Sequence, residues 1–250
     1  MASQAESPAL DTHAHIATDV TAPQVRGLAA SVVFAVTRNL SEAAAVPHGC
    51  YPTLVWGIGV HPGDSTALDR YEGDRFSRLL PRFSLVGEVG LDRRAGRLER
   101  QREVLGDILM RSAEAPVLMS IHSRGLAGEV VDLVERYQPR APILHWFAGG
   151  SDDIGRAAAA GAWFSVNAAA NAETLAALPP GRVLTETDFP FTRRQGSARP
   201  GATEPIERRL AELWGCDPLS ARMKVWQNLA SAVRQADVAG LPAGVLDHIR

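Results

Sequence analysis

The sequence is short of cysteine, lysine and long apolar runs, and each shortage excludes a class of protein. Two cysteines, Cys50 and Cys216, are too few for a disulfide framework or a thiolate metal cage. No run approaches the roughly 18 consecutive apolar residues that a membrane-spanning helix needs. Residues 1–8 lack the charged and apolar segments of a signal peptide. We therefore expect a cytoplasmic protein with no membrane partner.

Basic charge is not in excess either. The formal net charge is −2, so no overall positive field attracts nucleic acid. Lys224 is the single lysine among 26 basic side chains, and this bias toward arginine makes any arginine cluster weak evidence for phosphate binding. Six of the arginines could still form a local phosphate-binding rim: Arg93, Arg94, Arg97, Arg193, Arg194 and Arg199.

Apolar, β-branched segments recur eight times and alternate with helical patterns. Strands are expected in the segment leading into Asp11 and over 31–36, 53–58, 83–86, 116–121, 141–144, 162–166 and 182–185. Because these segments are apolar throughout rather than alternating, they favour a parallel sheet covered on both faces. Helices are expected over 98–112, 126–137, 151–161, 205–214 and 218–234.

Eight strand–helix alternations in 250 residues predict an α/β fold, a (β/α)8 TIM barrel. The structural alternative is a doubly wound open sheet. Its dinucleotide-binding form is weakened because no Gly-x-Gly-x-x-Gly follows the first strand. No linker divides the chain, so we expect one domain over 1–250, with residues 1–9 as a flexible N-terminus and 192–203 as a long loop.

Candidate metal ligands gather where the apolar segments end. Five of the seven histidines lie there, and only His48 and His248 fall elsewhere. The carboxyl ends of the strands of a barrel meet at one rim, so we expect the candidate ligands to converge. They are His13, His15, Glu88, His122, His145 and Asp188.

The composition of this set indicates its chemistry. Imidazole and carboxylate ligands suit Zn, Mn, Fe or Co, and Mg less well. Four histidines and two carboxylates exceed one tetrahedral site but fit two ions that share a bridging carboxylate. Two ions about 3.5–4 Å apart can activate a water and stabilise the oxygens of a phosphoryl centre.

Each residue taken alone has a structural explanation. Glu88 or His122 can cap the following helix, and Asp188, near Pro190, can be a turn residue. The joint occurrence of six such residues at strand ends favours a metal site. Trp146 and Trp163 are expected to pack in the barrel or its rim rather than to stack on bases.

From Asp11 to Asn228 the motifs, in order and spacing, resemble the TatD family of metal-dependent hydrolases. The resemblance implies phosphodiester hydrolysis by a metal-activated water, usually as a DNA exonuclease, with two divalent ions (Mg, Mn or Zn) and DNA as the substrate. It implies the following roles: His13 and His15 bind one ion, Glu88 bridges to a second, His122 and His145 bind the second, and Asp188 is a ligand that orients or deprotonates the water. It further implies that His61 and Arg124 contact the substrate phosphate, that Glu186 supports the site from behind, and that Gln101 and Asn228 organise the structure.

A narrower resemblance concerns four phrases, 118–124, 143–147, 163–167 and 182–188. They are similar to the TatD-like component of Qat anti-phage defence systems, in which Trp rather than Cys follows the histidine of strand six, as Trp146 does here. This similarity implies a role in defence, with other proteins of a defence operon as partners. The sequence departs from the broader family in two places that concern substrate binding and specificity. Thr203-Glu204-Pro205 replaces Asn-Glu-Pro, and the loop after Asp92 is short and rich in arginine.

Two other functions remain open. The same fold and metal pair serve amidohydrolases and lactonases that act on small molecules. A carbamylated lysine bridge is excluded, because no lysine precedes Lys224, and Glu88 must take that role. The second alternative is a catalytically silent subunit of a defence complex. The intact set of ligands argues against it, since a scaffold has no chemical need for them.

Overall fold

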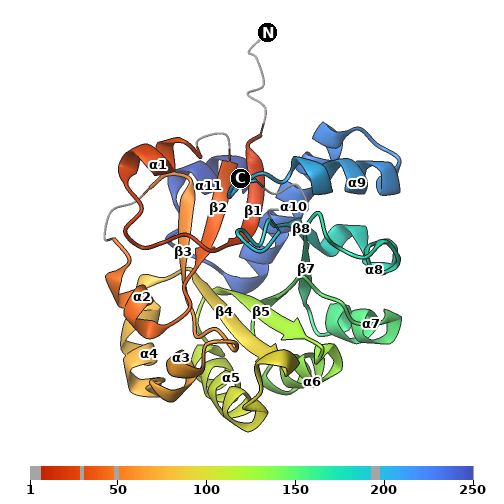
Figure 1. Ribbon diagram of the computed structural model, residues 1–250. Coiled ribbons are helices and arrows are strands. Elements are labelled where there is room, and N and C mark those ends of the chain that lie inside the picture. The colour runs from red at the N-terminus through yellow and green to blue at the C-terminus, as the bar shows by residue number, and fades with distance from the viewer. Residues whose placement is uncertain (1–6, 29–30, 48–50, 193–197, 250) are drawn as a thin grey trace.

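In the computed structural model, which describes residues 7–28, 31–47, 51–192 and 198–249, eight strands form a single sheet (Figure 1). Neighbouring strands are parallel and follow the order of the chain. The strands are β1 Ala9–Ala14, β2 Ser31–Val36, β3 Leu54–Ile58, β4 Leu85–Asp92, β5 Leu118–Arg124, β6 Ala141–His145, β7 Trp163–Val166 and β8 Val183–Thr185.

The sheet closes where β8 and the residues after it meet β1. Ala14 pairs with Phe189 in a parallel bridge. The His13 carbonyl accepts a hydrogen bond from the Asp188 amide at 2.9 Å. The Thr12 hydroxyl donates to the Thr185 carbonyl at 3.0 Å. The predicted (β/α)8 TIM barrel is therefore confirmed.

Helices lie around the strands, as Figure 1 shows. They are α1 Ala22–Arg26, α2 Leu40–Ala45, α3 Ser65–Asp69, α4 Gly73–Leu79, α5 Leu98–Ser112, α6 Ala127–Tyr137, α7 Ser151–Ala159, α8 Ala172–Ala177, α9 Glu204–Trp214, α10 Pro218–Ala236 and α11 Ala243–Ile249, with short 3-10 turns η1 Leu80–Arg82, η2 Arg93–Ala95 and η3 Pro180–Arg182. The helices expected from the sequence correspond to α5, α6, α7, α9 and α10. The others have at most seven residues, too few for a helical periodicity to be recognised. None of the helices in the described ranges is long and apolar enough to cross a bilayer.

Strand β4 extends beyond its predicted range of 83–86, so that Glu88 lies inside it. Glycines interrupt its apolar pattern, and they are needed for close backbone approach. A Cβ at Gly90 would lie 2.1 Å from the carbonyl oxygen of His122 on β5. Gly59, directly after the neighbouring strand β3, serves the same purpose, because a Cβ there would lie 2.3 Å from the backbone nitrogen of Glu88. These two glycines let the backbone around Glu88 fit tightly between its neighbours.

Helix α10 covers the amino ends of several strands through polar side chains. The Trp226 indole donates to the carbonyl of Pro8, just before β1, at 2.8 Å. The Asn228 amide donates to the carbonyl of Val183, the first residue of β8, at 2.8 Å. The Gln235 amide donates to the carbonyl of Gly161, just before β7, at 2.8 Å. The structural role expected for Asn228 follows directly from this contact.

The expected flexible N-terminus lies mostly outside the described residues, which begin at Ser7. The Ser7 carbonyl accepts a hydrogen bond from Arg222 at 3.2 Å, and Ala9 begins β1. The chain is therefore held by α10 before the first strand begins.

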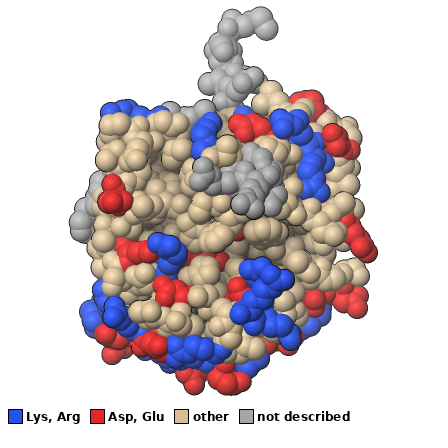
Figure 2. All heavy atoms as spheres, in the orientation of Figure 1, with Lys and Arg blue, Asp and Glu red and all other residues tan. Residues whose placement is uncertain are grey.

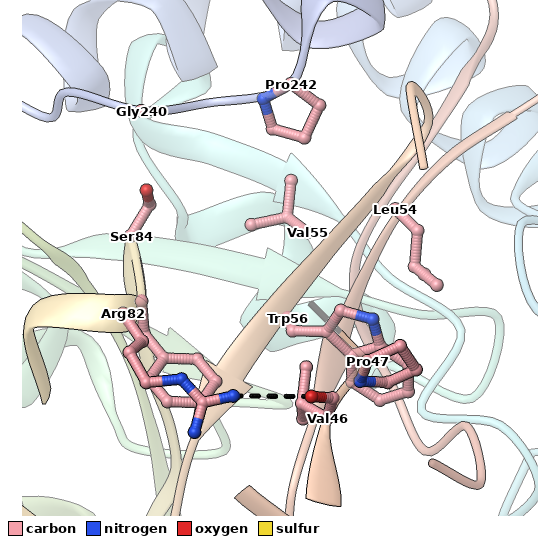
Figure 3. Close-up of a pocket in the computed structure, with 10 residues that line it drawn as sticks. Val46, Pro47, Leu54, Val55, Trp56, Arg82, Ser84, Gly240 and Pro242 are labelled. Carbon is pink, nitrogen blue, oxygen red and sulfur yellow. Dashed lines mark hydrogen bonds between the residues drawn. The ribbon is translucent and has the colours of Figure 1, made fainter. Parts of the chain in front are cut away.

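A cavity of about 210 Å³ lies at the amino ends of β3 and β4 (Figure 3). Apolar side chains form most of its wall, among them Leu54, Val55 and Pro242. The Arg82 guanidinium at its edge donates to the Val46 carbonyl at 3.3 Å. None of its described lining residues is a histidine, cysteine, aspartate or glutamate, so they offer no metal site.

Candidate metal centre

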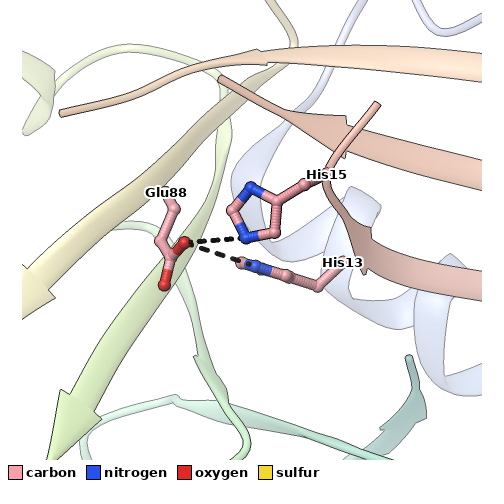
Figure 4. Close-up of side chains that lie close together, drawn as sticks. All are labelled: His13, His15 and Glu88. Atoms are coloured by element: carbon pink, nitrogen blue, oxygen red, sulfur yellow. Dashed lines mark ion pairs between the residues drawn. The ribbon is translucent and has the colours of Figure 1, made fainter. Parts of the chain in front are cut away.

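Glu88 lies at the centre of the predicted ligands, and one of its oxygens faces His13, on β1, and His15, directly after it. Its side chain is 1% exposed. The Oε2 atom lies 3.2 Å from His15 Nε2 and 3.6 Å from His13 Nε2 (Figure 4). Because side chains two apart on a strand point the same way, both rings reach the carboxylate from one side.

The other oxygen of Glu88 faces a different pair of histidines. Oε1 lies 2.7 Å from Nδ1 of His122, on β5, and 2.9 Å from Nε2 of His145, at the end of β6. The two ring nitrogens are themselves 2.9 Å apart. The carboxylate thus stands between two separate sets of imidazole nitrogens, which is the arrangement that a bridging ligand requires.

Asp188 joins the first of these sets. Its Oδ1 lies 3.6 Å from His15 Nε2 and 3.8 Å from His13 Nε2. The backbone of Asp188 is left-handed, with φ 46°, a conformation that aspartate tolerates better than most residues. All six ligands predicted from the sequence therefore come together at the carboxyl ends of the strands.

Buried polar atoms without hydrogen-bond partners show that this pocket suits a cation. They include Nε2 of His13, Nε2 of His15 and Oε2 of Glu88. An unpaired buried polar atom costs about 1–3 kcal/mol, so several together are unfavourable unless something coordinates them. Clusters of three possible ligand atoms, all within 4.8 Å of one another, include His13, His15 and Glu88, and also Glu88, His122 and His145. The donor set therefore fits divalent metal ions.

Polar neighbours behind the ligands fix the orientation of the rings. The Ser120 hydroxyl lies 2.7 Å from Nδ1 of His13, and Asp92 Oδ2 lies 3.4 Å from Nε2 of His122. Nδ1 of His145 faces Oε1 of Glu186 at 3.6 Å. These contacts leave the opposite ring nitrogen free to bind a metal.

The sequence predicted only Glu186 among these neighbours. Glu186 is fully buried and accepts a hydrogen bond from the Asn167 amide at 2.9 Å and another from Ser165. Asp92 and Ser120 lie two or four residues from a ligand on the same strand, so they share its face. That spacing is the signal that could have identified them.

Asp11 is buried in the same region but serves the backbone. Its carboxylate accepts hydrogen bonds from the Thr187 amide at 2.8 Å, the Thr187 hydroxyl at 2.7 Å and the Gly201 amide at 2.8 Å. Burial raises the pKa of Asp11 to about 7, against the lowering effect of these donors. Asp11 thereby holds the segment that carries Asp188 against β1.

Burial and neighbouring charges set the protonation of the ligands. Burial, assisted by the His145 imidazole, lowers the pKa of His13 to about 4, so that its ring is neutral at pH 7. Burial also raises the pKa of Asp188 to about 7. Glu88 is buried too, but His61 and His145 keep the pKa of its carboxyl well below the usual value.

A cavity of about 480 Å³ opens onto the ligands. His61 and Arg124, the residues expected to contact a substrate phosphate, both line it. His61 Nε2 also lies 3.3 Å from Glu88 Oε2, a distance close to that of His15. His61 therefore lies both in the wall of the cavity, where a substrate phosphate is expected, and beside the predicted metal ligand Glu88.

The expected arginine rim is only partly free to bind phosphate. Arg97 pairs with Asp69, donating to its Oδ2 at 2.7 Å, and Arg93 donates to the Gly125 carbonyl at 2.9 Å. Arg193 and Arg194 lie outside the described residues. On the face shown in Figure 2, the basic and acidic side chains of the described residues are intermingled.

Two other expectations concern residues near the site. Gln101 lies behind β4, where its side chain accepts from the Asp92 amide at 2.7 Å and donates to the Asp92 carbonyl at 3.0 Å. It thus organises the end of the strand, as expected. Trp163 is 4% exposed and packs in the core, also as expected. Trp146, in contrast, is half-buried and lines the cavity.

Comparisons with known proteins agree with this geometry. The model of the family TatD related DNase matches residues 10–234. The solved structure of YjjV, a TatD homologue from Escherichia coli K12, superposes with a TM-score of 0.71 at 20% identity, covering 91% of this chain and 98% of that one. A TatD family hydrolase from Entamoeba histolytica gives a TM-score of 0.71 at 15% identity, covering 91% and 99%. No curated protein sequence matches this chain.

The two solved structures show the shared fold, and the family model shows the family. That model spans most of the sequence, from β1 to α10, and therefore includes every ligand described above. The chain belongs to the TatD family of metal-dependent hydrolases.

Proposed function

We propose that this protein hydrolyses phosphodiester bonds in DNA, releasing nucleotides from strand ends, with two divalent ions. The position of Glu88 carries this proposal, because its two oxygens face separate sets of ring nitrogens. A single carboxylate between two sets of ligands is what a two-ion site needs. The match to the TatD related DNase family supports DNA as the substrate.

In this proposal His13, His15 and Asp188 would hold one ion with Glu88 Oε2, and His122 and His145 would hold the other with Oε1. Bound Mg, Mn or Zn would polarise the phosphate and make a water nucleophilic. Glu88 is ionised because neighbouring histidines lower its pKa, so it offers both oxygens as ligands.

The protein's own groups would then act on the proton and on the substrate. Asp188 lines the cavity beside the other predicted ligands, where its carboxylate can accept a proton from the attacking water and release it again. Arg124 and His61 line the same cavity and can donate hydrogen bonds to phosphate oxygens. Glu186 holds the ring of His145 in orientation.

A catalytically silent scaffold is less consistent with this site. Nε2 of His13, Nε2 of His15 and Oε2 of Glu88 are buried without hydrogen-bond partners. Buried polar atoms of this kind destabilise a fold unless they bind a ligand. An active metal centre gives them a function.

The biological setting is also a proposal. The phrases around His122, His145 and Asp188, with Trp146 after His145, support a cytoplasmic role in anti-phage defence beside other proteins of a defence operon. The test is phage plating on cells that carry the operon with the wild-type protein or with Asp188→Ala. Protection is expected only with the wild type, and equal protection by both would contradict an enzymatic role in defence.

The enzymatic proposal is tested with metal-stripped protein resupplied with Mg, Mn or Zn, acting on single-stranded DNA labelled at the 5′ or the 3′ end. We expect metal-dependent shortening from one end and its loss in Asp188→Ala, with the circular dichroism spectrum unchanged. Absence of cleavage despite full metal occupancy would contradict the nuclease and direct attention to small-molecule esters or amides.

A further inference from the structure

Phe191 lies at the mouth of the metal-centre cavity with most of its ring in solvent. It is 63% exposed, the highest value among the exposed large apolar residues that the structure describes. Its ring stands perpendicular to that of His15, with centroids 5.5 Å apart. One apolar ring therefore borders the cavity beside the metal ligands without being buried by the fold.

The backbone holds this ring in place. The Phe191 amide donates to the Asp188 carbonyl at 2.8 Å, closing a turn directly after the ligand. The next residue, Thr192, is buried, and its hydroxyl donates to the carbonyl of Thr187. The turn is thus anchored on both sides of Phe191, and the outward position of the ring is built into it.

Trp146 contributes a second aromatic surface to the same cavity. It follows the ligand His145 with a left-handed φ of 40°, and its amide donates to the Ser165 carbonyl at 3.1 Å. Its indole N–H makes no hydrogen bond to any residue that the structure describes, whereas the indole of Trp163 donates to Gln235 at 3.1 Å. Trp146 therefore lies at the rim of the barrel, as the sequence predicted, and lines the cavity as well.

We propose that Phe191 and Trp146 form a binding site for an unpaired nucleobase next to the metal centre. The proposal rests on the proposed function and makes it more specific: the two aromatic residues would hold the base of the nucleotide whose phosphate lies at the metal centre. Aromatic side chains bind single strands by stacking on bases, and this works for every base because each has a flat π-face.

The chemistry of the cavity favours this occupant. Its lining combines histidines and carboxylates, which suit a phosphate with its metals, with the aromatic residues Trp146 and Phe191. A nucleotide joins a phosphate and a flat ring through one sugar, so it can contact both regions at once. Neither inorganic phosphate nor a small polar ester would use the aromatic part.

Binding is the first test, because it does not depend on turnover. We would measure fluorescence anisotropy of labelled oligothymidylate and of a matched abasic strand, using metal-loaded Asp188→Asn protein. The expected preference for bases is about 5- to 150-fold in Kd, which corresponds to one stacked base. Phe191→Ala should remove most of this preference, Phe191→Trp should retain it, and Trp146→Ala should reduce it.

Met110→Ala is the matched control, because Met110 is 58% exposed but lies on α5 and does not line the cavity. It should bind both strands as the parent does. Equal affinity of the parent for normal and abasic strands, or no binding of either, would overturn the inference, as would full base preference in Phe191→Ala.

Turnover by the Asp188-containing protein distinguishes this inference from the proposed function. If DNA is cleaved, Phe191→Ala should raise KM for single strands with little change in kcat, and should have little effect on a strand with an abasic end. If no phosphodiester is cleaved while base-dependent binding persists, the nuclease proposal fails and the binding site stands. If cleavage is equally fast with normal and abasic ends, the nuclease stands and the base site fails.

Discussion

The two ends of the barrel differ in what they leave unpaired. At the amino ends, backbone carbonyls at Pro8, Gly161 and Val183 accept hydrogen bonds from side chains of α10. At the carboxyl ends, several buried polar side-chain atoms have no hydrogen-bond partner among the described residues. Six of the eight buried side-chain atoms without partners, among the residues that the structure describes, belong to four histidines and Glu88.

This difference indicates that the amino ends of the strands contribute mainly to stability and the carboxyl ends mainly to reactivity. The amino ends are covered and their cavity is lined mainly by apolar groups, so changes there should act on the free energy of unfolding. The carboxyl ends keep unpaired ligands beside an open cavity, so changes there should act on metal binding and turnover. Barrel enzymes in general divide these roles in the same way.

The largest effect is expected from Glu88→Gln at the carboxyl ends. The amide cannot offer two anionic oxygens to two sets of ring nitrogens, so metal content should fall and DNA hydrolysis should drop on the order of 10³-fold or more. Elemental analysis of purified protein and steady-state rates measure both. Glu129→Gln, on the outer helix α6, is the control. Full occupancy and a normal rate in Glu88→Gln would disprove the bridging role.

Leu118→Ala probes the other end of a strand that also carries a ligand. Leu118 begins β5, is fully buried, and lies four residues before His122. Loss of its side chain should lower the free energy of unfolding by about 2–5 kcal/mol, measured by urea denaturation. We expect kcat/KM of the folded protein to stay within about twofold. A large fall in kcat/KM at unchanged stability would contradict the assignment of stability to the amino ends and of reactivity to the carboxyl ends.

Asp92→Asn should have the smallest of these effects. It compares a residue behind a predicted metal ligand with the ligands themselves. The amide keeps an acceptor for the Arg94 N–H, which lies 2.7 Å from Oδ1 in the wild type. It loses the negative charge that faces Nε2 of His122. Metal affinity should fall about 10- to 100-fold, as for other carboxylates behind a ligating histidine. Isothermal titration measures this change, and unaltered affinity would show that Asp92 serves only the turn after β4.

The sequence was sufficient for the barrel and for the convergence of the ligands, because both follow from apolar runs that end in polar residues. Glu88 and His122 could be found since a carboxylate or an imidazole in an apolar strand has few structural uses. Ser120 could not, because a serine in a strand is common and acquires meaning only 2.7 Å from His13. The rim position expected for Trp146 agrees with the structure, but its place in the wall of the cavity could not be predicted, because it depends on the turn after β6.

The hydrogen bonds of α10 also bear on the synthesis of the chain. The indole of Trp226 reaches the carbonyl of Pro8 across 218 positions of sequence. The ribosome releases the N-terminal side of the chain first, so the first strand lacks this partner until α10 has emerged. Contacts so distant in sequence slow the search for the native state. The nascent barrel therefore keeps its amino ends uncovered until α10 emerges, and for that interval it is exposed to chaperones and to premature association.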